Sequence, residues 1–340
     1  MNLIIRDITD ETIWNNFITA HPEANFLQSW QWGEFQADRG RNILRRGVYD
    51  GDRLIGAYTG HIEPARRGKH IEIAGGPIID WNDEAAVKML FDDMRAQAKE
   101  TACVFVRVRP QLEDSAEARV KFQKLGLRKA PMYLSVELAG VLDISKDEAQ
   151  ILSEMRPNTR RAVRKGEKEG ITIETSSDPA AVKEFYDIQL ETAKRHGFFA
   201  FGESFLTKQF AAFARTDNVI LYTAKLGKDI LAQNFMIFYG NEASYHYGVS
   251  TALGTKHPGA PLLHMQAMRD ARTRGIKRYN FWGIVDENDT KHRFYGVSRF
   301  KRSFGVSELR YLPAHDIVIG KIAYLKTLAI ETARRRHRHV

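Results

Sequence analysis

Gly47-Val48-Tyr49-Asp50-Gly51-Asp52-Arg53-Leu54-Ile55-Gly56-Ala57-Tyr58 reads as a strand, an Asp-Gly turn and a second strand. Apolar and aromatic runs on both sides of an Asp-Gly pair predict a β-hairpin. Residues 220–235 have the same form, and their turn glycine, Gly227, follows Gly51 at an offset of 176 residues. Two matching hairpins indicate that the chain contains one structural unit twice.

A helix and a strand follow each predicted hairpin. In the first half, Asn82 is a good helix N-cap, and a strand is predicted at residues 103–108. In the second half, Pro261 opens a helix that Gly275 ends, and a strand is predicted at residues 278–282. The centres of these strands, Phe105 and Tyr279, lie 174 residues apart. The order and the spacing of the elements are therefore repeated along with the hairpins.

A short helix closes each half, ending at Gly126 in the first and at Gly305 in the second, an offset of 179 residues. We interpret the repeated order as a tandem duplication. An alternating α/β protein whose halves share no ancestry is the alternative. Hairpin, helix, strand, helix and strand make a mixed sheet covered by helices, which is an α/β (α+β) fold. We expect a first domain at residues 1–150, a second at 151–310, and a terminal strand and helix at 311–340.

The element order resembles the GCN5-related N-acyltransferase (GNAT) fold. Such enzymes cradle the pyrophosphate of acetyl-coenzyme A with a glycine-rich loop before the central helix, where backbone amides and the helix dipole meet the anion. The matching loop here is residues 255–261, Thr-Lys-His-Pro-Gly-Ala-Pro, with one glycine in place and prolines on both sides of the Gly-Ala pair. Prolines remove backbone donors. The fold suggests acyl transfer, whereas the loop argues against coenzyme A as the acyl carrier.

The composition is that of a globular protein of 340 residues, with 43% apolar and 27% charged residues. A net charge of +9 attracts polyanions such as nucleic acid, nucleotide-linked substrates or anionic lipid. The single cysteine, Cys103, lies in a strand-like run, where a small core residue is a better interpretation than a nucleophile. We find no signal peptide, membrane span or Cys/His metal cluster in the sequence, and we expect a cytoplasmic protein without a bound metal.

Residues 292–305, His-Arg-Phe-Tyr-Gly-Val-Ser-Arg-Phe-Lys-Arg-Ser-Phe-Gly, place one lysine among apolar and aromatic residues. Read as a helix, Val297, Phe300, Lys301 and Phe304 share a face. A lysine there is unusual, because burying an unpaired ammonium is costly. One interpretation is a snorkelling lysine at the edge of a packed helix. The other is a cation held where negative charge develops in a transition state.

A basic helix is predicted where the halves meet, between Pro157 and Gly170. Its cations are Arg160 and Arg164 on one face, with Arg161, Lys165 and Lys168 on a neighbouring one. A solvated basic face is one interpretation. The other is a helix that contacts the backbone phosphates of a nucleic acid, which would give affinity without sequence readout.

Several short stretches together resemble the FemABX family of peptidoglycan-bridge aminoacyltransferases. The resemblance covers nearly the whole chain, and the stretches occur in the family's order. They are residues 25–35 (Asn-Phe-Leu-Gln-Ser-Trp-Gln-Trp-Gly-Glu-Phe), 75–78 (Gly-Gly-Pro-Ile), 155–160 (Met-Arg-Pro-Asn-Thr-Arg), 192–198 (Thr-Ala-Lys-Arg-His-Gly-Phe), 245–248 (Tyr-His-Tyr-Gly), 260–263 (Ala-Pro-Leu-Leu), Phe300-Lys301 and Phe304-Gly305.

The resemblance implies two acyltransferase-like domains, with the terminal strand and helix packing back on the first. It implies a monomeric enzyme that moves an amino acid from aminoacyl-tRNA to the side-chain amine of the third residue of a peptidoglycan stem peptide. An aminoacyl-tRNA donor explains the missing coenzyme-A loop. The chain is similar to the short members without a helical arm, which act on soluble UDP-MurNAc-pentapeptide. Three interpretations of the basic end of the chain stay open, namely a solvated tail, a tRNA contact, or peripheral contact with an anionic membrane.

The resemblance also assigns residues. Lys301 matches a lysine beside the reacting carbonyl, with Phe300 shaping its pocket. Arg195 matches an arginine that meets the acceptor's diphosphate. Tyr247, with Tyr245 beside it, matches a tyrosine at the peptide end of the acceptor cleft. A surface arginine and a core strand tyrosine are the alternatives for Arg195 and Tyr247.

Departures from the family pattern concern the acceptor. After Trp32, the family's diphosphate-binding lysine lies near the position of Gln36, which adds no charge. Arg109 stands where many members have an aspartate, and Phe199 where some have a tyrosine. The same chemistry on lipid II or on a protein N-terminus is therefore an alternative. A non-catalytic RNA-binding protein on this scaffold is another, although it leaves Lys301 unexplained.

Overall fold

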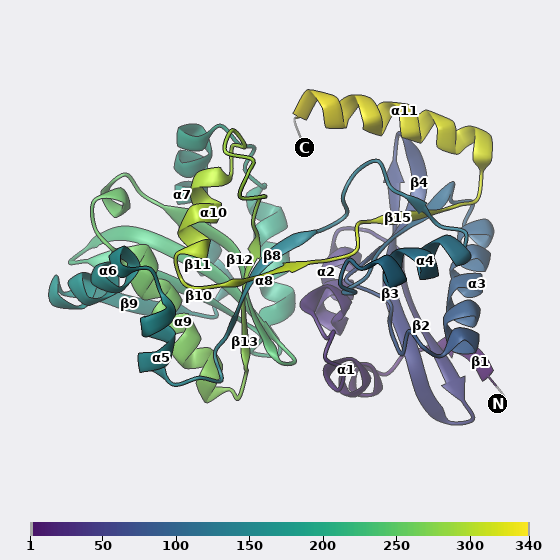
Figure 1. The fold of residues 1–340 in the computed structure, drawn as a ribbon, viewed down its shortest axis with the longest axis horizontal. Coiled ribbons are helices and arrows are strands. Elements are labelled where there is room, and N and C mark those ends of the chain that lie inside the picture. Colours follow the sequence, from purple (N-terminus) through teal and green to yellow (C-terminus); the bar gives the residue numbers. More distant parts are fainter. Residues whose placement is uncertain (1–2, 339–340) are drawn as a thin grey trace. The chain divides into compact units, whose positions relative to one another are not determined.

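A computed structural model describes residues 3–338, apart from the side chains of residues 196 and 336–338. The chain forms two compact units, one of Met1–Glu137 with Arg310–Val340 and one of Leu138–Leu309 (Figure 1). The second unit begins at Leu138 rather than at residue 151, because strand β8 (Leu138–Asp143) pairs antiparallel with β13 (Arg278–Gly283) in the second sheet. Each unit is an α/β structure around its own mixed sheet.

The first sheet has the order β1-β2-β3-β4-β6-β15-β7, with β5 paired to β3. The hairpin expected around Gly51 is β2 and β3, and Gly51 adopts a φ of 61° that suits the turn. All neighbouring strands are antiparallel except β4 and β6. The strands are β1 (Leu3–Asp7), β2 (Ile43–Asp50), β3 (Arg53–Ala65), β4 (Gly68–Ala74), β5 (Ile78–Ile79), β6 (Phe105–Arg109), β7 (Arg128–Lys129) and β15 (His315–Val318).

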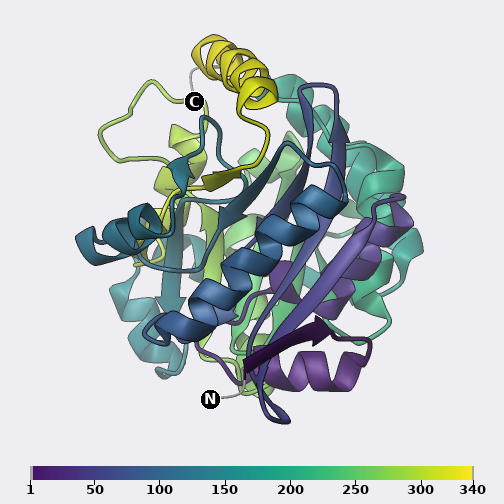
Figure 2. The same ribbon diagram turned by 90° about the vertical axis from the view of Figure 1, so that its right-hand side faces the viewer.

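The main helix of this unit is α3 (Glu84–Glu100), which packs across β1, β2, β3 and β6 (Figure 2). Asp83, not Asn82, is its N-cap and accepts a hydrogen bond from the amide of Ala86. The buried face of α3 carries Leu90, Phe91 and Met94, as the sequence periodicity predicts. The remaining helical segments are α1 (Glu11–Thr19), the 3₁₀ turn η1 (Phe26–Gln28), α2 (Trp30–Asp38), α4 (Ala116–Lys124) and α11 (Lys321–Arg338).

The end of the chain belongs to the first unit. Strand β15 pairs antiparallel with β6, and α11 contacts β4. The basic run that begins at Arg334 continues α11, and the side chains beyond Arg335 lie outside the described residues. The chain thus returns to its first sheet after completing the second unit.

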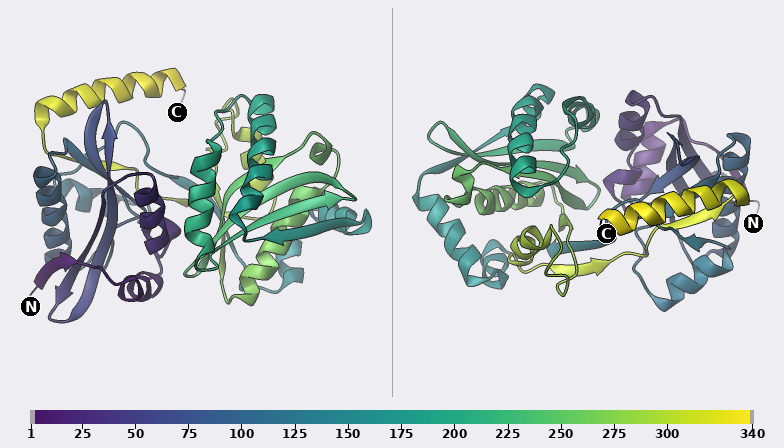
Figure 3. Two further views of the ribbon diagram at one scale, coloured as in Figure 1. Left: turned by 180° about the vertical axis from the view of Figure 1, so that it is seen from behind. Right: turned by 90° about the horizontal axis from the view of Figure 1, so that it is seen from above.

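The second sheet has the order β14-β8-β13-β12-β11-β10-β9, in which β12 and β13 are the parallel pair. Its expected hairpin is β10 and β11, with Gly227 at a φ of 59°. Figure 3 shows α7 and α8 on one face of this sheet and α9 on the other. The strands are β8, β9 (Ile171–Ser176), β10 (Val219–Leu226), β11 (Asp229–Tyr239), β12 (Glu242–Ser250), β13 and β14 (Ser307–Arg310).

Helix α9 fills the core on its face of the second sheet. Its buried residues include Leu263, Met265 and Met268, which pack with Phe281 and Phe304. None of the helices in the described part of the chain is long and apolar enough to cross a membrane. The helical segments are α5 (Glu148–Glu154), α6 (Pro157–Lys168), η2 (Pro179–Ala181), α7 (Val182–His196), α8 (Glu203–Ala214), η3 (Leu253–Thr255), α9 (Gly259–Thr273) and α10 (Tyr295–Arg302).

Candidate functional site

Lys301 is a buried lysine on α10, with 8% of its surface exposed. Its Nζ donates a 2.7 Å hydrogen bond to the carbonyl oxygen of Gly283, at the end of β13, and lies 5.4 Å from the ring centroid of Tyr245. No carboxylate among the described residues pairs with it. Because the ammonium points at a strand end inside the unit, the snorkelling interpretation does not hold. Val297, expected on the same buried face, is exposed instead.

Burial lowers the pKa of Lys301 to about 7, because the charged form loses its hydration. The neighbouring ring of His264 carries no compensating negative charge, and burial lowers the pKa of His264 to about 3. Lys301 therefore exists in both protonation states near neutral pH. Such a side chain can stabilise a developing negative charge as an ammonium and can also exchange a proton with a reacting group.

The parallel pairing of β12 and β13 breaks beside Lys301. The ladder covers Glu242 to Ser244 and ends opposite Asn280, although both strands continue. Beyond that point each strand is irregular. Strand β12 bulges opposite the Phe235/Met236 step, and in β13 Trp282 takes a φ of 62°. Strained backbone of this kind gathers at functional sites. We refer to residues 245–250 and 281–283 as the β12/β13 break.

The bulge in β12 sends the two candidate tyrosines to opposite faces of the sheet. Tyr247 stays opposite Phe235 and packs on it at a centroid distance of 5.5 Å, on the side of α7 and α8. Tyr245 packs on His264 of α9 at 4.6 Å. With His246 as the extra residue, Tyr245 and Gly248 share a face, and a Cβ on Gly248 would meet the Tyr245 hydroxyl at 1.7 Å. A side chain at position 248 would therefore displace the Tyr245 ring.

Tyr245 is the tyrosine that the structure brings to Lys301. Burial raises the pKa of Tyr245, so its hydroxyl stays protonated and can donate a hydrogen bond. That hydroxyl makes no hydrogen bond to any described residue, and Tyr245 as a whole residue is half-buried. Phe300 packs on His264 at 5.6 Å and closes the aromatic surroundings of the lysine. An ammonium and a phenol hydroxyl thus flank the β12/β13 break from one side.

Arg195 and Tyr247 lie on the other side of the sheet. Arg195, near the end of α7, donates from Nη2 to the carbonyl oxygen of Ser250 and, at 3.2 Å, to its hydroxyl. Gly197 ends α7 in the left-handed conformation and starts a loop in which Phe199 is 96% exposed. Tyr247 packs on Phe201 of that loop at 5.2 Å. The rings of His246 and Trp282 meet at 5.6 Å between the two strands, so both sides border the same break.

An open groove of about 690 Å³ lies next to Phe300. The first turn of α6 forms one wall and α10 the other, and three arginines contribute to the lining. Of these arginines, Arg161 is predicted from the sequence as a binding residue, whereas Arg156 and Arg299 are not, although Arg299 stands two residues before Lys301. The full lining is Arg156, Pro157, Asn158, Thr159, Arg161, Gly296, Arg299, Phe300 and Ser303.

The other cations of α6 differ in their surroundings. Arg160 donates from Nη1 to the carbonyl oxygens of Ser153 and Met155, which closes the end of α5. Lys165 pairs with Glu169 at 3.2 Å. Arg164 is exposed and makes no hydrogen bond or ion pair with described residues. The structure therefore gives Arg160 a local structural role and leaves Arg161 and Arg164 facing solvent.

Of the candidate residues of the first unit, Gln36 is buried and Trp32 is partly exposed. Gln36 is buried on α2, and its side-chain oxygen accepts a 2.6 Å hydrogen bond from Arg39. Trp32 packs between Phe26 and Phe35. Arg109, at the family's aspartate position, is buried with its Nε on the hydroxyl of Ser135. These contacts fix the three side chains within unit one.

The described residues contain no group of three or more His, Cys, Asp or Glu side chains suited to a metal ion. An acidic side chain lies beside the loop before α9, because His257 of that loop contacts the carboxylate of Glu169, the C-cap residue of α6, at 3.2 Å. Gly166 of α6 packs against Leu262 and the carbonyl oxygen of Pro258 at the start of α9. A covered helix start beside a carboxylate is a poor receptor for a pyrophosphate.

Comparisons with known proteins relate both halves of the chain to acyltransferases. Residues 153–302 match the acetyltransferase (GNAT) domain model, and residues 8–124 match the FemAB family model. The chain is 23% identical to the lipid II:glycine glycyltransferase of Staphylococcus saprophyticus subsp. saprophyticus, over 94% of each chain. It is 20% identical to the enzyme of that name from Staphylococcus haemolyticus, over 91% of each.

Solved structures show the same fold. The structure of FemX aligns with a TM-score of 0.87 at 18% identity, over 97% of this chain and 100% of that one. A tandem GNAT protein from the clavulanic acid biosynthesis pathway aligns with a TM-score of 0.57 at 11% identity, over 93% and 98%. The expected two acyltransferase-like domains are thus confirmed at the level of the fold.

Proposed function

Because the chain is a tandem GNAT protein of the FemABX family, we propose that it transfers an amino acid from aminoacyl-tRNA to the side-chain amine of the third stem-peptide residue of a peptidoglycan precursor. The observation that carries the proposal is Lys301, a buried lysine without a counter-ion at the β12/β13 break. A protein that only bound RNA would have no use for so costly a group.

The reaction needs one activated carbonyl, one amine and one proton transfer. The acceptor amine attacks the ester carbonyl carbon, a C–N bond forms, and the carbonyl oxygen becomes an oxyanion. The C–O bond to the tRNA ribose then breaks, and the ribose hydroxyl leaves with the proton that the amine gave up. The Lys301 ammonium and the Tyr245 hydroxyl, which flank the break together, stabilise the oxyanion. With its pKa lowered to about 7, Lys301 also exchanges the proton between amine and leaving oxygen.

The donor is held in the arginine-lined groove. Arg156, Arg161 and Arg299 line this groove together with Phe300, the residue before Lys301. Guanidinium groups suit the phosphates of an RNA end, and Phe300 belongs both to the lining of this groove and to the aromatic surroundings of Lys301. The loop before α9 is covered by α6 and contacted by the Glu169 carboxylate, which supports tRNA rather than coenzyme A as the acyl carrier.

The acceptor is UDP-MurNAc-pentapeptide in this proposal, with Arg195 meeting the diphosphate and Tyr247 the peptide. Only residues 197–202 separate α7 from α8, so the chain has the arm-free form that the sequence resemblance connects with the soluble acceptor. The curated relatives are named for lipid II, which makes the lipid-linked form of the same muropeptide the second candidate.

The test is a transfer assay with total charged tRNA, UDP-MurNAc-pentapeptide and, in parallel, lipid II. We expect a product whose mass exceeds that of the acceptor by one amino-acid residue, and no acetylated product when acetyl-coenzyme A replaces the tRNA. Transfer from acetyl-coenzyme A alone would refute the proposed donor.

The groove is tested separately. Arg156→Glu with Arg299→Glu should weaken tRNA binding for all isoacceptors alike and reduce its salt dependence, since phosphate contacts carry no sequence readout. Lys228→Glu with Lys277→Glu, at two exposed lysines of the same unit, is the matched double charge reversal. Equal losses in both variants would mean that net charge, and not the groove, binds the tRNA.

A further inference from the structure

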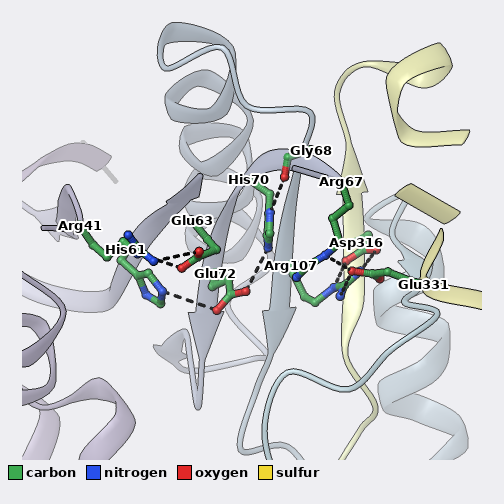
Figure 4. Close-up of polar contacts among 10 residues, drawn as sticks. All are labelled: Arg41, His61, Glu63, Arg67, Gly68, His70, Glu72, Arg107, Asp316 and Glu331. Carbon is green, nitrogen blue, oxygen red and sulfur yellow. Dashed lines mark hydrogen bonds and ion pairs between the residues drawn. The ribbon is translucent and has the colours of Figure 1, made fainter. Parts of the chain in front are cut away.

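The inner face of α11 is fastened to the first unit by buried charges (Figure 4). The Glu331 carboxylate is fully buried and accepts hydrogen bonds from Arg107, at 2.8 Å from Nη2, and from Nε of Arg67. Arg107 in turn forms a two-pronged pair with Asp316 of β15 at 2.7 and 2.8 Å. Removing one partner of such a set leaves an uncompensated buried charge, so the helix is held in one orientation.

Two further contacts fix the rotation of α11 about its axis. The Tyr324 hydroxyl donates a 2.7 Å hydrogen bond to Asp316, and the hydroxyl of Thr327 donates to the carbonyl oxygen of Arg67. Tyr324, Thr327 and Glu331 are spaced by three and four residues and define the buried face. The opposite face is consequently fixed toward solvent.

That outward face is apolar. Ile322 is 87% exposed and Leu325 60% exposed, and Ala329 and Ala333 continue the same stripe. The spacing of 322, 325, 329 and 333 keeps the four residues on one side of a helix. Ile322 and Leu325 do not pack into either hydrophobic core. Two large aliphatic side chains that are exposed to solvent on a rigidly held helix indicate an interaction surface.

The charges around the stripe have one sign. Lys321, Lys326 and Arg334 are exposed and make no ion pair or hydrogen bond with described residues. Between residues 321 and 335 the single acidic residue is Glu331, which is buried on the inner face. The outward face therefore presents aliphatic side chains bordered by cations only.

We propose that α11 docks on the surface of an anionic lipid bilayer. A helix with an aliphatic stripe bordered by lysine and arginine lies in the headgroup region with its apolar side chains inserted and its cations on the lipid phosphates. An RNA partner would satisfy the cations but would leave Ile322 and Leu325 in water. The proposal concerns a different unit from that of Lys301 and does not depend on the transfer reaction.

The test is flotation of the full-length protein with two kinds of vesicle. One is phosphatidylcholine alone and the other phosphatidylcholine with phosphatidylglycerol in a ratio of roughly three to one. We expect binding to the anionic vesicles only. Ile322→Ser with Leu325→Ser should lower vesicle affinity by more than about tenfold. Lys321→Gln and Lys326→Gln should each cost about fivefold. Melting curves should not change, because these side chains are exposed.

The matched control is Ile13→Ser with Val120→Ser, which removes two half-exposed aliphatic residues from α1 and α4 of the same unit. This control should float like the parent. Equal binding of the Ile322/Leu325 variant and the parent would overturn the proposal. A loss of tRNA binding in the lysine variants, with vesicle binding intact, would also overturn it and would assign this face to RNA.

Discussion

Replacing Lys301 by methionine should stabilise the second unit while it disables the enzyme. Methionine keeps the length of the apolar stem and removes the charge. Burial lowers the pKa of Lys301 from 10.5 to about 7, and one pKa unit corresponds to about 1.4 kcal/mol. At pH 7 the folded protein therefore carries a penalty of about 4 kcal/mol from this group. Methionine also loses the hydrogen bond to Gly283, which costs about 1 kcal/mol of stability. We therefore expect Lys301→Met to be more stable than the parent by about 3 kcal/mol at pH 7.

The sign of the pH dependence identifies the cause. Between pH 7 and 10.5 the unfolded lysine holds a proton that the folded lysine has released. The parent therefore gains stability with rising pH in that window, by about 1.4 kcal/mol per pH unit, whereas the methionine variant does not. The advantage of the variant should be greatest at or below pH 7 and should vanish near pH 10.

Urea unfolding of parent and variant at several pH values measures this difference. Lys277→Met is the control, because Lys277 is an exposed lysine of the same unit and its removal should give no such trend. A stability difference between parent and Lys301→Met that stays constant from pH 7 to pH 10 would refute the assignment of Lys301 as a buried, readily deprotonated amine.

Three other changes have defined outcomes. Burial raises the pKa of Glu72, but the hydrogen bond to His70 and nearby charges outweigh burial and lower the pKa to about 2. The ionised carboxylate therefore contributes about 3 kcal/mol of stability above pH 4.5, which is lost as the pH falls to 2. In Glu72→Gln this pH-dependent contribution should be absent when stability is measured by urea unfolding. Gly248→Ala should displace Tyr245 and lower turnover by more than about tenfold, whereas Gly202→Ala, where a Cβ meets nothing within 4 Å, should leave kcat unchanged. Glu331→Leu should lower the free energy of unfolding of the first unit by roughly 3 kcal/mol in urea titrations, because Arg67 and Arg107 lose a buried partner. An unchanged unfolding free energy would mean that α11 is not held by these pairs.

The repeated elements of the fold could be predicted from the sequence, because each is a local pattern. The Asp-Gly and Leu-Gly-Lys turns give two hairpins, and the apolar periodicity of residues 84–100 gives α3. The domain boundary could not be predicted this way. Strand β8 follows the first unit in sequence, but its pairing with β13 is non-local and assigns it to the second.

The same distinction applies to the candidate site. The unusual position of Lys301 is visible in the helical pattern, and its burial follows. No local sequence pattern predicts the bulge at His246, so only the three-dimensional structure shows that Tyr245 and Tyr247 lie on opposite faces of the sheet. The sequence places Arg160 and Arg161 on neighbouring faces of one basic helix but does not show that Arg160 closes α5 and Arg161 lines the groove. Such differences depend on which backbone carbonyls the fold brings within reach.

The role of Lys301 in transfer is tested by comparing parent, Lys301→Met and Lys277→Met in single-turnover reactions with charged tRNA and the muropeptide acceptor, with the product measured by mass. Loss of one oxyanion-stabilising donor should lower the rate of Lys301→Met by roughly 10²–10³, with tRNA binding retained. Lys277→Met should react like the parent. A Lys301→Met enzyme as fast as the parent would contradict the assignment of this lysine to the reaction.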